Sequence, residues 1–220
     1  EYRHIMVEKA VAFDEALMKK YLEQGEAAIT AEELSSAIRK GTVSNKAVPV
    51  ICGSAFKNKG IQKLLDAVTA YLPSPLDVPA VEGHDLQEPD KMLPRKPEAN
   101  EPFAGLAFKV QADPHMGKLV YTRIYSGCLE TGTYVLNSTK NKKERIARIV
   151  QMHANQRENI ENAFAGDIVA VVGLGNTVTG DTLCDPENPV LLEAIQFPTP
   201  VVSLSIAPKS RSDQDKLGKG

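Results

Sequence analysis

The sequence predicts a multi-domain α/β plus β protein, in which a helical and α/β segment precedes an antiparallel β-barrel. Apolar residues recur at helical spacing through residues 1–72, on both sides of one strand-like run. Short alternating runs separated by Gly and Asp turns fill residues 103–184 and are typical of a barrel. Prolines crowd residues 76–99, which we therefore expect to be a linker, because proline removes a backbone donor and disfavours helix.

Residues 1–45 are expected to be helical. A stripe at helical spacing predicts a helix within residues 1–24 that ends at Gly25. The stripe consists of Met6, Ala10, Phe13, Leu17 and Tyr21. Thr30 and Glu33 fit a capping box, in which each side chain satisfies a free backbone N–H, and Gly41 is expected to end the short helix that follows.

Residues 46–75 are expected to form a strand, a tight loop and a helix. The apolar run 48–52 predicts the strand, with Cys52 buried and inert, and Gly60 precedes a helix with one apolar face. In open α/β sheets, ligands bind at loops that follow the carboxyl ends of strands. Ser54 and Ala55 in the intervening loop are therefore candidate ligand-binding residues.

Residues 100–197 are expected to form the barrel. Its predicted strands are 103–110, 118–125, 133–137, 145–152, 168–172 and 182–184. A further strand is expected at 201–206, and residues 198–220 would open another domain that the chain does not complete. The chain also starts without Met, so we expect a fragment of a longer protein.

Composition excludes several classes of site. The formal net charge is −2, so no global basic field recruits nucleic acid. Three cysteines without a Cys-x-x-Cys pair and four scattered histidines predict reduced thiols and no metal site, as in the cytoplasm. No apolar run is long enough to cross a membrane. Residues 175–182 approach a phosphate-binding loop, but Asp181 replaces its lysine, so we expect a turn between strands and assign no catalytic residue.

One local excess of positive charge remains, at Lys142, Lys143 and Arg145. At a turn these side chains could neutralise phosphates of RNA. An ordinary solvated hairpin explains them equally well. Few aromatic residues are interleaved with them in the sequence, which disfavours base stacking.

Several segments together closely resemble bacterial elongation factor G, the translocation GTPase. They are residues 53–60 (GSAFKNKG), 71–75 (YLPSP), 123–127 (RIYSG), 142–145 (KKER), 152–155 (MHAN), 165–167 (AGD) and 208–217. The resemblance extends over essentially the whole chain. It implies the C-terminal end of a P-loop GTPase domain with a helical insert, then the barrel, then the start of an α+β domain.

The resemblance also implies sites and partners. Ser54, Ala55 and Phe56 would support the guanine base of GTP or GDP, which the parent protein binds with Mg²⁺. The barrel would contact small-subunit ribosomal RNA, and the insert helices at 1–45 would contact the ribosomal stalk protein in the cytoplasm.

The phosphate-binding loop, the switch regions and the Asn-Lys-x-Asp guanine motif of that family do not occur in these 220 residues. We therefore expect the fragment neither to bind GTP tightly nor to hydrolyse it, since phosphoryl transfer depends on those parts. Two alternatives stay open. One is a free-standing RNA- or protein-binding barrel module, and the other is a related ribosomal GTPase of the release-factor or ribosome-protection type.

Overall fold

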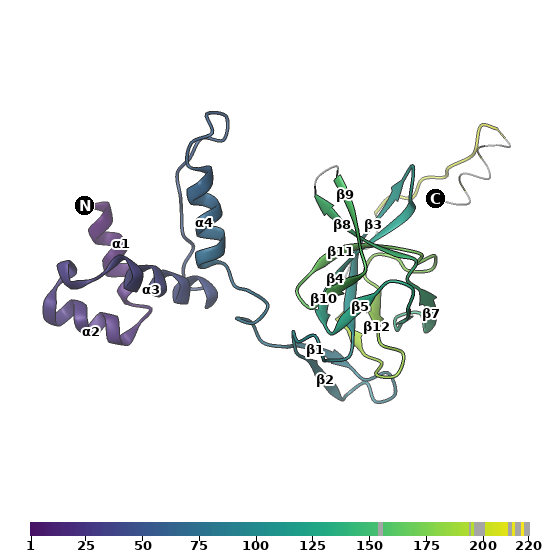
Figure 1. Cartoon of the computed structure of the whole chain (residues 1–220), viewed down its shortest axis with the longest axis horizontal. Helices are drawn as coiled ribbons and strands as arrows, with labels where there is room; N and C mark the ends of the chain where they lie inside the picture. The colour runs from purple at the N-terminus through teal and green to yellow at the C-terminus, as the bar shows by residue number, and fades with distance from the viewer. Residues whose placement is uncertain (154–155, 194, 196–200, 211–212, 214–216, 218–220) are drawn as a thin grey trace. The chain divides into compact units, whose positions relative to one another are not determined.

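The computed structural model describes residues 1–153, 156–193, 195, 201–210, 213 and 217. The chain divides into two compact units, Glu1–Pro79 and Ala80–Gly220. Figure 1 shows helices in the first unit and strands in the second.

The first helical stripe is split between two helices, α1 (Tyr2–Val11) and α2 (Glu15–Gln24). Between them, the side chain of Asp14 accepts hydrogen bonds from the backbone N–H groups of Ala16 and Leu17 and so begins a new helix. The prediction of one continuous helix is therefore wrong. Gly25 follows α2 with a positive φ of 79°, which confirms it as the stop.

A short 3₁₀ turn, η1 (Glu26–Ala28), leads to α3 (Ala31–Val43). The predicted capping box between Thr30 and Glu33 is confirmed. Gly41 does not end α3, because the helix continues to Val43. A Cβ atom on Gly41 would lie 2.6 Å from the Phe13 ring, so this glycine allows close packing instead. The buried core of the unit contains Val7, Ala10, Val11, Leu17, Ile29, Leu34 and Ala37.

The predicted strand at 48–52 does not form. Within the described residues, the only β contact of this region is an isolated bridge between Ser54 and Lys59. An extended segment becomes a strand only when a neighbour satisfies its backbone groups, and Val50 is 87% exposed. Cys52 is likewise exposed rather than buried. Helix α4 (Ile61–Tyr71) forms as predicted, but its apolar face lies open to solvent.

The second unit is built on an eight-stranded antiparallel sheet with the order β7-β6-β12-β3-β4-β11-β8-β9, beside a two-stranded sheet of β5 and β10. The strands are β3 (Ala104–Asp113), β4 (Gly117–Ser126), β5 (Cys128–Glu130), β6 (Tyr134–Asn137), β7 (Lys142–Arg145), β8 (Arg148–His153), β9 (Gln156–Ile160), β10 (Asn162–Phe164), β11 (Ile168–Val172) and β12 (Thr182–Cys184).

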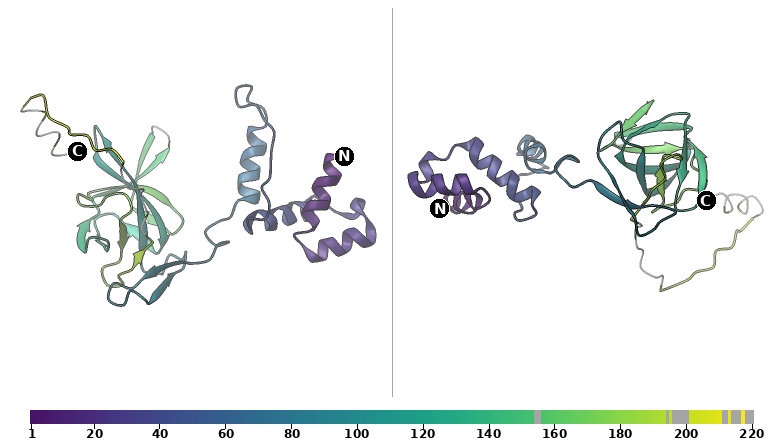
Figure 2. Two further views of the ribbon diagram at one scale, coloured as in Figure 1. Left: turned by 180° about the vertical axis from the view of Figure 1, so that it is seen from behind. Right: turned by 90° about the horizontal axis from the view of Figure 1, so that it is seen from below.

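The large sheet curls on itself. Strand β7 lies at one edge of the sheet, and β8 is the second strand from the other edge. Only Ile146 and Ala147 separate these two strands in the chain, so the two sides of the sheet lie close together. The backbone N–H of Ala147 bonds the carbonyl of Val172 in β11, which joins the two sides. The curled sheet, seen in the two views of Figure 2, encloses one apolar core. Its fully buried members include Val120, Ile124, Leu129, Ile146, Ile149, Val171, Leu174 and Leu183.

The expected linker at 76–99 is only partly a linker. Strands β1 (Val81–His84) and β2 (Met92–Arg95) form a hairpin, and β1 also pairs with β13 (Leu191–Leu192). The prolines of this range do not prevent pairing, because Pro94 lies in β2, at the edge of the three-stranded sheet, where a missing N–H is tolerated.

The strand expected at 201–206 is not present, and Val201 and Leu204 are exposed. These residues have no neighbouring strand among those described, so nothing satisfies an extended backbone. Most of the remaining part of the domain expected at 198–220 lies outside the described residues.

Candidate functional site

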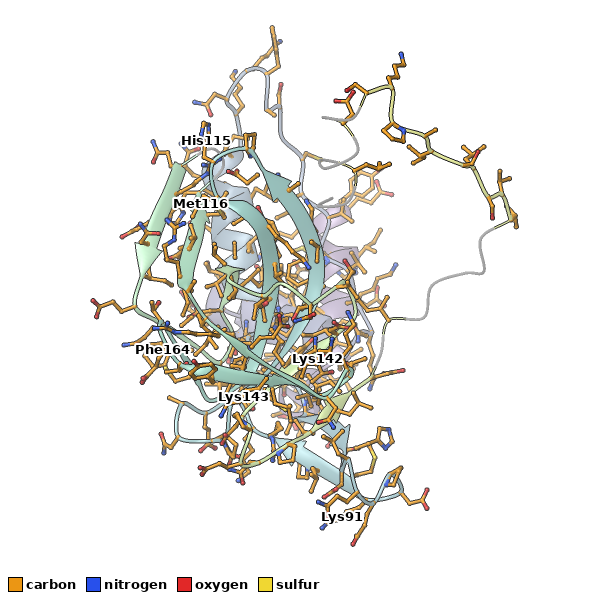
Figure 3. The ribbon with its side chains drawn as sticks, turned by 90° about the vertical axis from the view of Figure 1, so that its right-hand side faces the viewer. Lys91, His115, Met116, Lys142, Lys143 and Phe164 are labelled. Carbon is orange, nitrogen blue, oxygen red and sulfur yellow. The ribbon has the colours of Figure 1, made fainter. Side chains whose placement is uncertain are left out.

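The cationic residues singled out in the sequence lie in a strand rather than a turn. Residues 138–141 make the turn, with Asn141 at a φ of 52°, and Lys142–Arg145 form β7 at the edge of the large sheet. The expectation of a basic turn is therefore wrong in its local structure. The side chains of Lys142, Lys143 and Arg145 are all exposed (Figure 3 labels the two lysines).

Strand geometry separates the three side chains. Lys143 and Arg145 share one face of the sheet, and the register places Tyr134 of β6 opposite Arg145. The Lys143 Nζ atom lies 5.2 Å from the centre of the Tyr134 ring, which is 54% exposed. We call Tyr134, Lys143 and Arg145 the β6–β7 basic surface. Tyr134 was missed in the sequence, because only the strand register brings it beside the cations.

Lys142 points to the other face. Its Nζ atom lies 3.5 Å from Oδ1 of Asn176, in the loop between β11 and β12. Lys140 turns the same way and donates to the Asn176 carbonyl at 2.6 Å, while pairing with Asp181 at 3.1 Å. Lys142 therefore does not join the β6–β7 basic surface.

A buried polar network holds β7 in place. Glu144, on the inner side of the strand, accepts hydrogen bonds from the Thr177 hydroxyl at 2.5 Å and from the Asn176 backbone N–H at 2.7 Å. Asn137 of β6 donates to Thr177 at 3.2 Å and to Asp181 at 2.8 Å. This network confirms that residues 175–182 serve as a turn between strands.

The second predicted site, the loop at 54–59, lies in the helical unit. Ser54 and Lys59 exchange backbone hydrogen bonds of 2.9 and 3.0 Å, and Gly60 closes the loop with a φ of 80°. A Cβ atom on Gly60 would lie 3.2 Å from the Cys52 carbonyl oxygen, so the neck of the loop is narrow. Within the described chain, no hydrogen bond engages the Ala55 N–H, and the Phe56 side chain is fully exposed.

This loop could accept only one edge of a nucleotide. A free backbone N–H beside small side chains suits the carbonyl oxygen of a guanine base, as the resemblance implies for Ser54, Ala55 and Phe56. The Gly-x-x-x-x-Gly-Lys-Ser/Thr pattern that would hold phosphates and Mg²⁺ does not occur in this sequence. The guanine contact stays a prediction.

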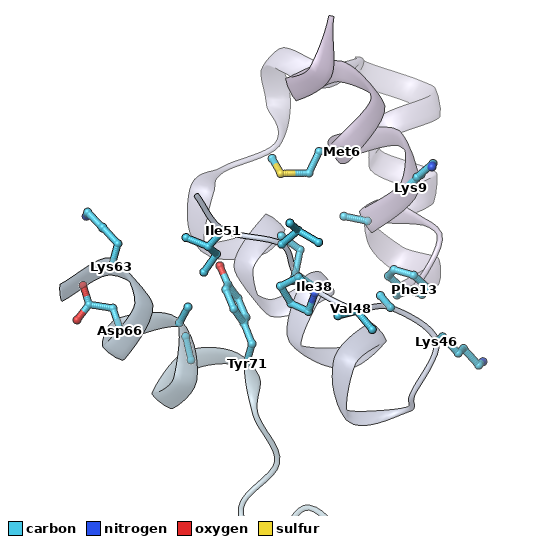
Figure 4. Close-up of a pocket in the computed structure, with 16 residues that line it drawn as sticks. Met6, Lys9, Phe13, Ile38, Lys46, Val48, Ile51, Lys63, Asp66 and Tyr71 are labelled. Atoms are coloured by element: carbon cyan, nitrogen blue, oxygen red, sulfur yellow. The ribbon is translucent and has the colours of Figure 1, made fainter. Parts of the chain in front are cut away.

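The helical unit also contains an open groove of about 710 Å³ between α1, α3, α4 and residues 46–51 (Figure 4). Its lining is mainly apolar and includes Phe13, Val48 and Tyr71, together with Lys9 and Lys63. Among the described residues, no cluster of His, Cys, Asp and Glu could hold a metal ion. No described helix is both long and apolar enough to cross a membrane.

Residues 102–186, which include all strands from β3 to β12, match the family model of elongation factor G domain 2. The chain also resembles a crystal structure of a protein from Thermus thermophilus, with a TM-score of 0.69 and 28% sequence identity. That similarity covers 96% of this chain but only 29% of the other protein. The predicted likeness to elongation factor G is thus confirmed for the barrel.

Proposed function

We propose that the chain is a section of a translational GTPase of the bacterial elongation factor G type, the factor that moves tRNA and mRNA through the ribosome. In this section, the barrel contacts small-subunit ribosomal RNA through the β6–β7 basic surface. The observation that carries the proposal is the family match over the whole barrel. The exposed side chains of Lys143, Arg145 and Tyr134 place positive charge and an aromatic ring on one surface. The cations can bind RNA phosphates, and the ring can stack on a base.

In the parent protein, the loop at Ser54, Ala55 and Phe56 would support the guanine of GTP or GDP. The section itself is expected neither to hydrolyse GTP nor to bind nucleotide tightly, since the phosphate-binding loop and the switch regions that these activities need do not occur in its 220 residues. The helices of residues 1–45 would contact the ribosomal stalk protein, and the parent protein would act in the cytoplasm.

The test is binding of the chain to purified small ribosomal subunits over a range of salt concentrations. Replacing both Lys143 and Arg145 with Gln removes two charges without introducing repulsion. If each contacts a phosphate, the slope of log K against log salt concentration falls by about 1 per residue.

The matched control is Lys91→Gln. Lys91 is an exposed lysine between β1 and β2, with its Nζ 3.9 Å from Asp85 (labelled in Figure 3). This control variant is expected to bind like the wild type. Equal affinity and equal salt slope for the double variant and the wild type would contradict the proposal.

A further inference from the structure

A second face of the barrel combines aromatic rings with cations. Along β4, Val120, Thr122 and Ile124 are fully buried in the barrel, so Tyr121, Arg123 and Tyr125 point outward. Leu119, on the same outer side, is itself buried with Val150 and Ala170, and Tyr121 packs against this cluster. We define the β4 outer face as those outward residues and their neighbours on β3. It consists of Phe108, Lys109, Tyr121, Arg123 and Tyr125.

The rings and cations of this face are in contact. The register pairs Lys109 with Tyr121, and the Lys109 Nζ atom lies 5.4 Å from the Tyr121 ring centre. A bulge between Ala107 and Lys109 brings Phe108 to the same side, with its ring centre 6.4 Å from that of Tyr121. Further along β4, the Arg123 guanidinium lies 5.5 Å from the Tyr125 ring.

Lys109, Arg123 and Arg148 supply positive charge on this side of the sheet, and Glu193 lines a pocket beside Tyr125. Among the described residues, neither Lys109 nor Arg123 forms an ion pair with a carboxylate, and the register also places Arg148 of β8 here, opposite Val172 of β11. The nearby Asp113 is already paired with Arg157, at 2.6 Å. The face therefore attracts an anionic partner.

We propose that the β4 outer face binds a short unpaired stretch of RNA. Bases would stack on the rings of Phe108, Tyr121 and Tyr125, while Lys109 and Arg123 would neutralise the phosphates between them. Outward residues on one strand are about 7 Å apart. Phe108 and Lys109 are exposed, and Tyr121, Arg123 and Tyr125 are half-buried, so each keeps part of its surface accessible. Aromatic rings interleaved with cations on a sheet face are typical of surfaces that bind single-stranded nucleic acid. An acidic peptide would satisfy the cations but would leave the ring faces unused.

This inference rests on the proposed function, because it assigns a class of RNA to another face of the same barrel. It differs from that proposal in its residues and in the form of the RNA. The β6–β7 basic surface contributes one aromatic ring and two cations, whereas the β4 outer face has three rings on two neighbouring strands.

The experiment measures fluorescence anisotropy of a labelled eight-nucleotide single-stranded RNA with the full chain, against a duplex of the same sequence. The single strand is expected to bind more tightly than the duplex. Tyr121→Leu, which keeps an apolar side chain, is expected to weaken binding roughly fivefold or more, and so is Tyr125→Leu. Lys109→Gln, at an exposed site, keeps a long polar side chain, is expected to retain the fold and is also expected to weaken binding.

Phe164→Leu is the matched control, since Phe164 is also an exposed strand aromatic but lies in β10, which pairs with β5, and belongs to neither proposed RNA surface. It is expected to leave binding of the single strand unchanged. Equal binding of duplex and single strand, or equal effects of Tyr121→Leu and Phe164→Leu, would overturn the inference. So would displacement of the RNA by a polyglutamate peptide at equal charge concentration. Failure of the wild-type chain to bind small subunits would instead count against the proposed function.

Discussion

Replacing Thr177 with Val tests how the basic strand is held. Thr177 is fully buried, and its hydroxyl donates to Glu144 at 2.5 Å while accepting from Asn137 at 3.2 Å. Valine has nearly the same shape but can do neither. The change therefore removes one donor from a buried carboxylate and one acceptor from a buried amide.

The structure sets the size of the effect. A hydrogen bond to a charged group contributes about 1.5–3 kcal/mol, and a buried polar atom left without a partner costs about 1–3 kcal/mol. In the variant, the Asn137 amide keeps its hydrogen bond to Asp181, and Glu144 keeps the hydrogen bond from the Asn176 N–H. Only part of the cost of leaving a buried polar atom without a partner therefore applies. We expect a loss of about 2–3 kcal/mol in the free energy of unfolding of the barrel.

Hydrogen exchange read by mass spectrometry is the suitable assay, because it reports on each unit separately. The slowest amides of the barrel are expected in β11, whose Val169, Ala170 and Val171 are buried. Their exchange should accelerate roughly 30- to 150-fold in the Thr177→Val variant, because each 1.36 kcal/mol is a factor of ten.

The control for this variant is Thr133→Val, which removes an exposed hydroxyl bonded to the Glu130 carbonyl. It is expected to change stability by less than about 0.5 kcal/mol. Exchange within about threefold of the wild type for Thr177→Val would refute the reasoning that this network holds β7.

Three further predictions follow from the two units. Gly41→Ala should destabilise the helical unit by about 1–3 kcal/mol in thermal unfolding followed by circular dichroism, because the new Cβ would overlap the Phe13 ring; a rise in stability, normal for Gly→Ala in a helix, would contradict this. The backbone N–H of His115 and the charge of Arg157 lower the pKa of Asp113. The ionised Asp113 carboxylate therefore stabilises the fold at neutral pH. This stabilisation is lost as the pH falls below about 4 and through the lowered pKa. Urea unfolding should therefore separate Asp113→Asn from the wild type at about pH 7 but not at about pH 2. Labelled GTP should show no micromolar binding to the chain, and such binding would contradict the expected loss of the phosphate contacts.

The sequence correctly predicted two kinds of element: those whose backbone hydrogen bonds are made locally, and strands that have neighbouring strands in the barrel. The capping box at Thr30 and helix α4 depend on residues a few positions apart, and both form as expected. Strand β4 alternates from Val120 to Ser126 and has partners on both sides. The apolar run at 48–52 has the composition of a strand but no partner among the described residues, so composition alone misled the prediction.

The candidate surfaces depended on information that the sequence does not display. The basic residues Lys143 and Arg145 were visible, but their separation from Lys142 and their proximity to Tyr134 follow from the register of β6 and β7. The aromatic face around Tyr121 depends on a bulge in β3, which no spacing rule reveals. Long-range pairing therefore decided which residues meet.

The proposed contact between the β6–β7 basic surface of the barrel and small-subunit ribosomal RNA can be mapped directly. Hydroxyl-radical footprinting of that RNA on purified subunits, with and without the chain, provides the map. We expect a discrete protected region that persists with Lys91→Gln and disappears when Lys143 and Arg145 are both replaced with Gln. No protection by the wild-type chain, or the same protection by the double variant, would contradict it.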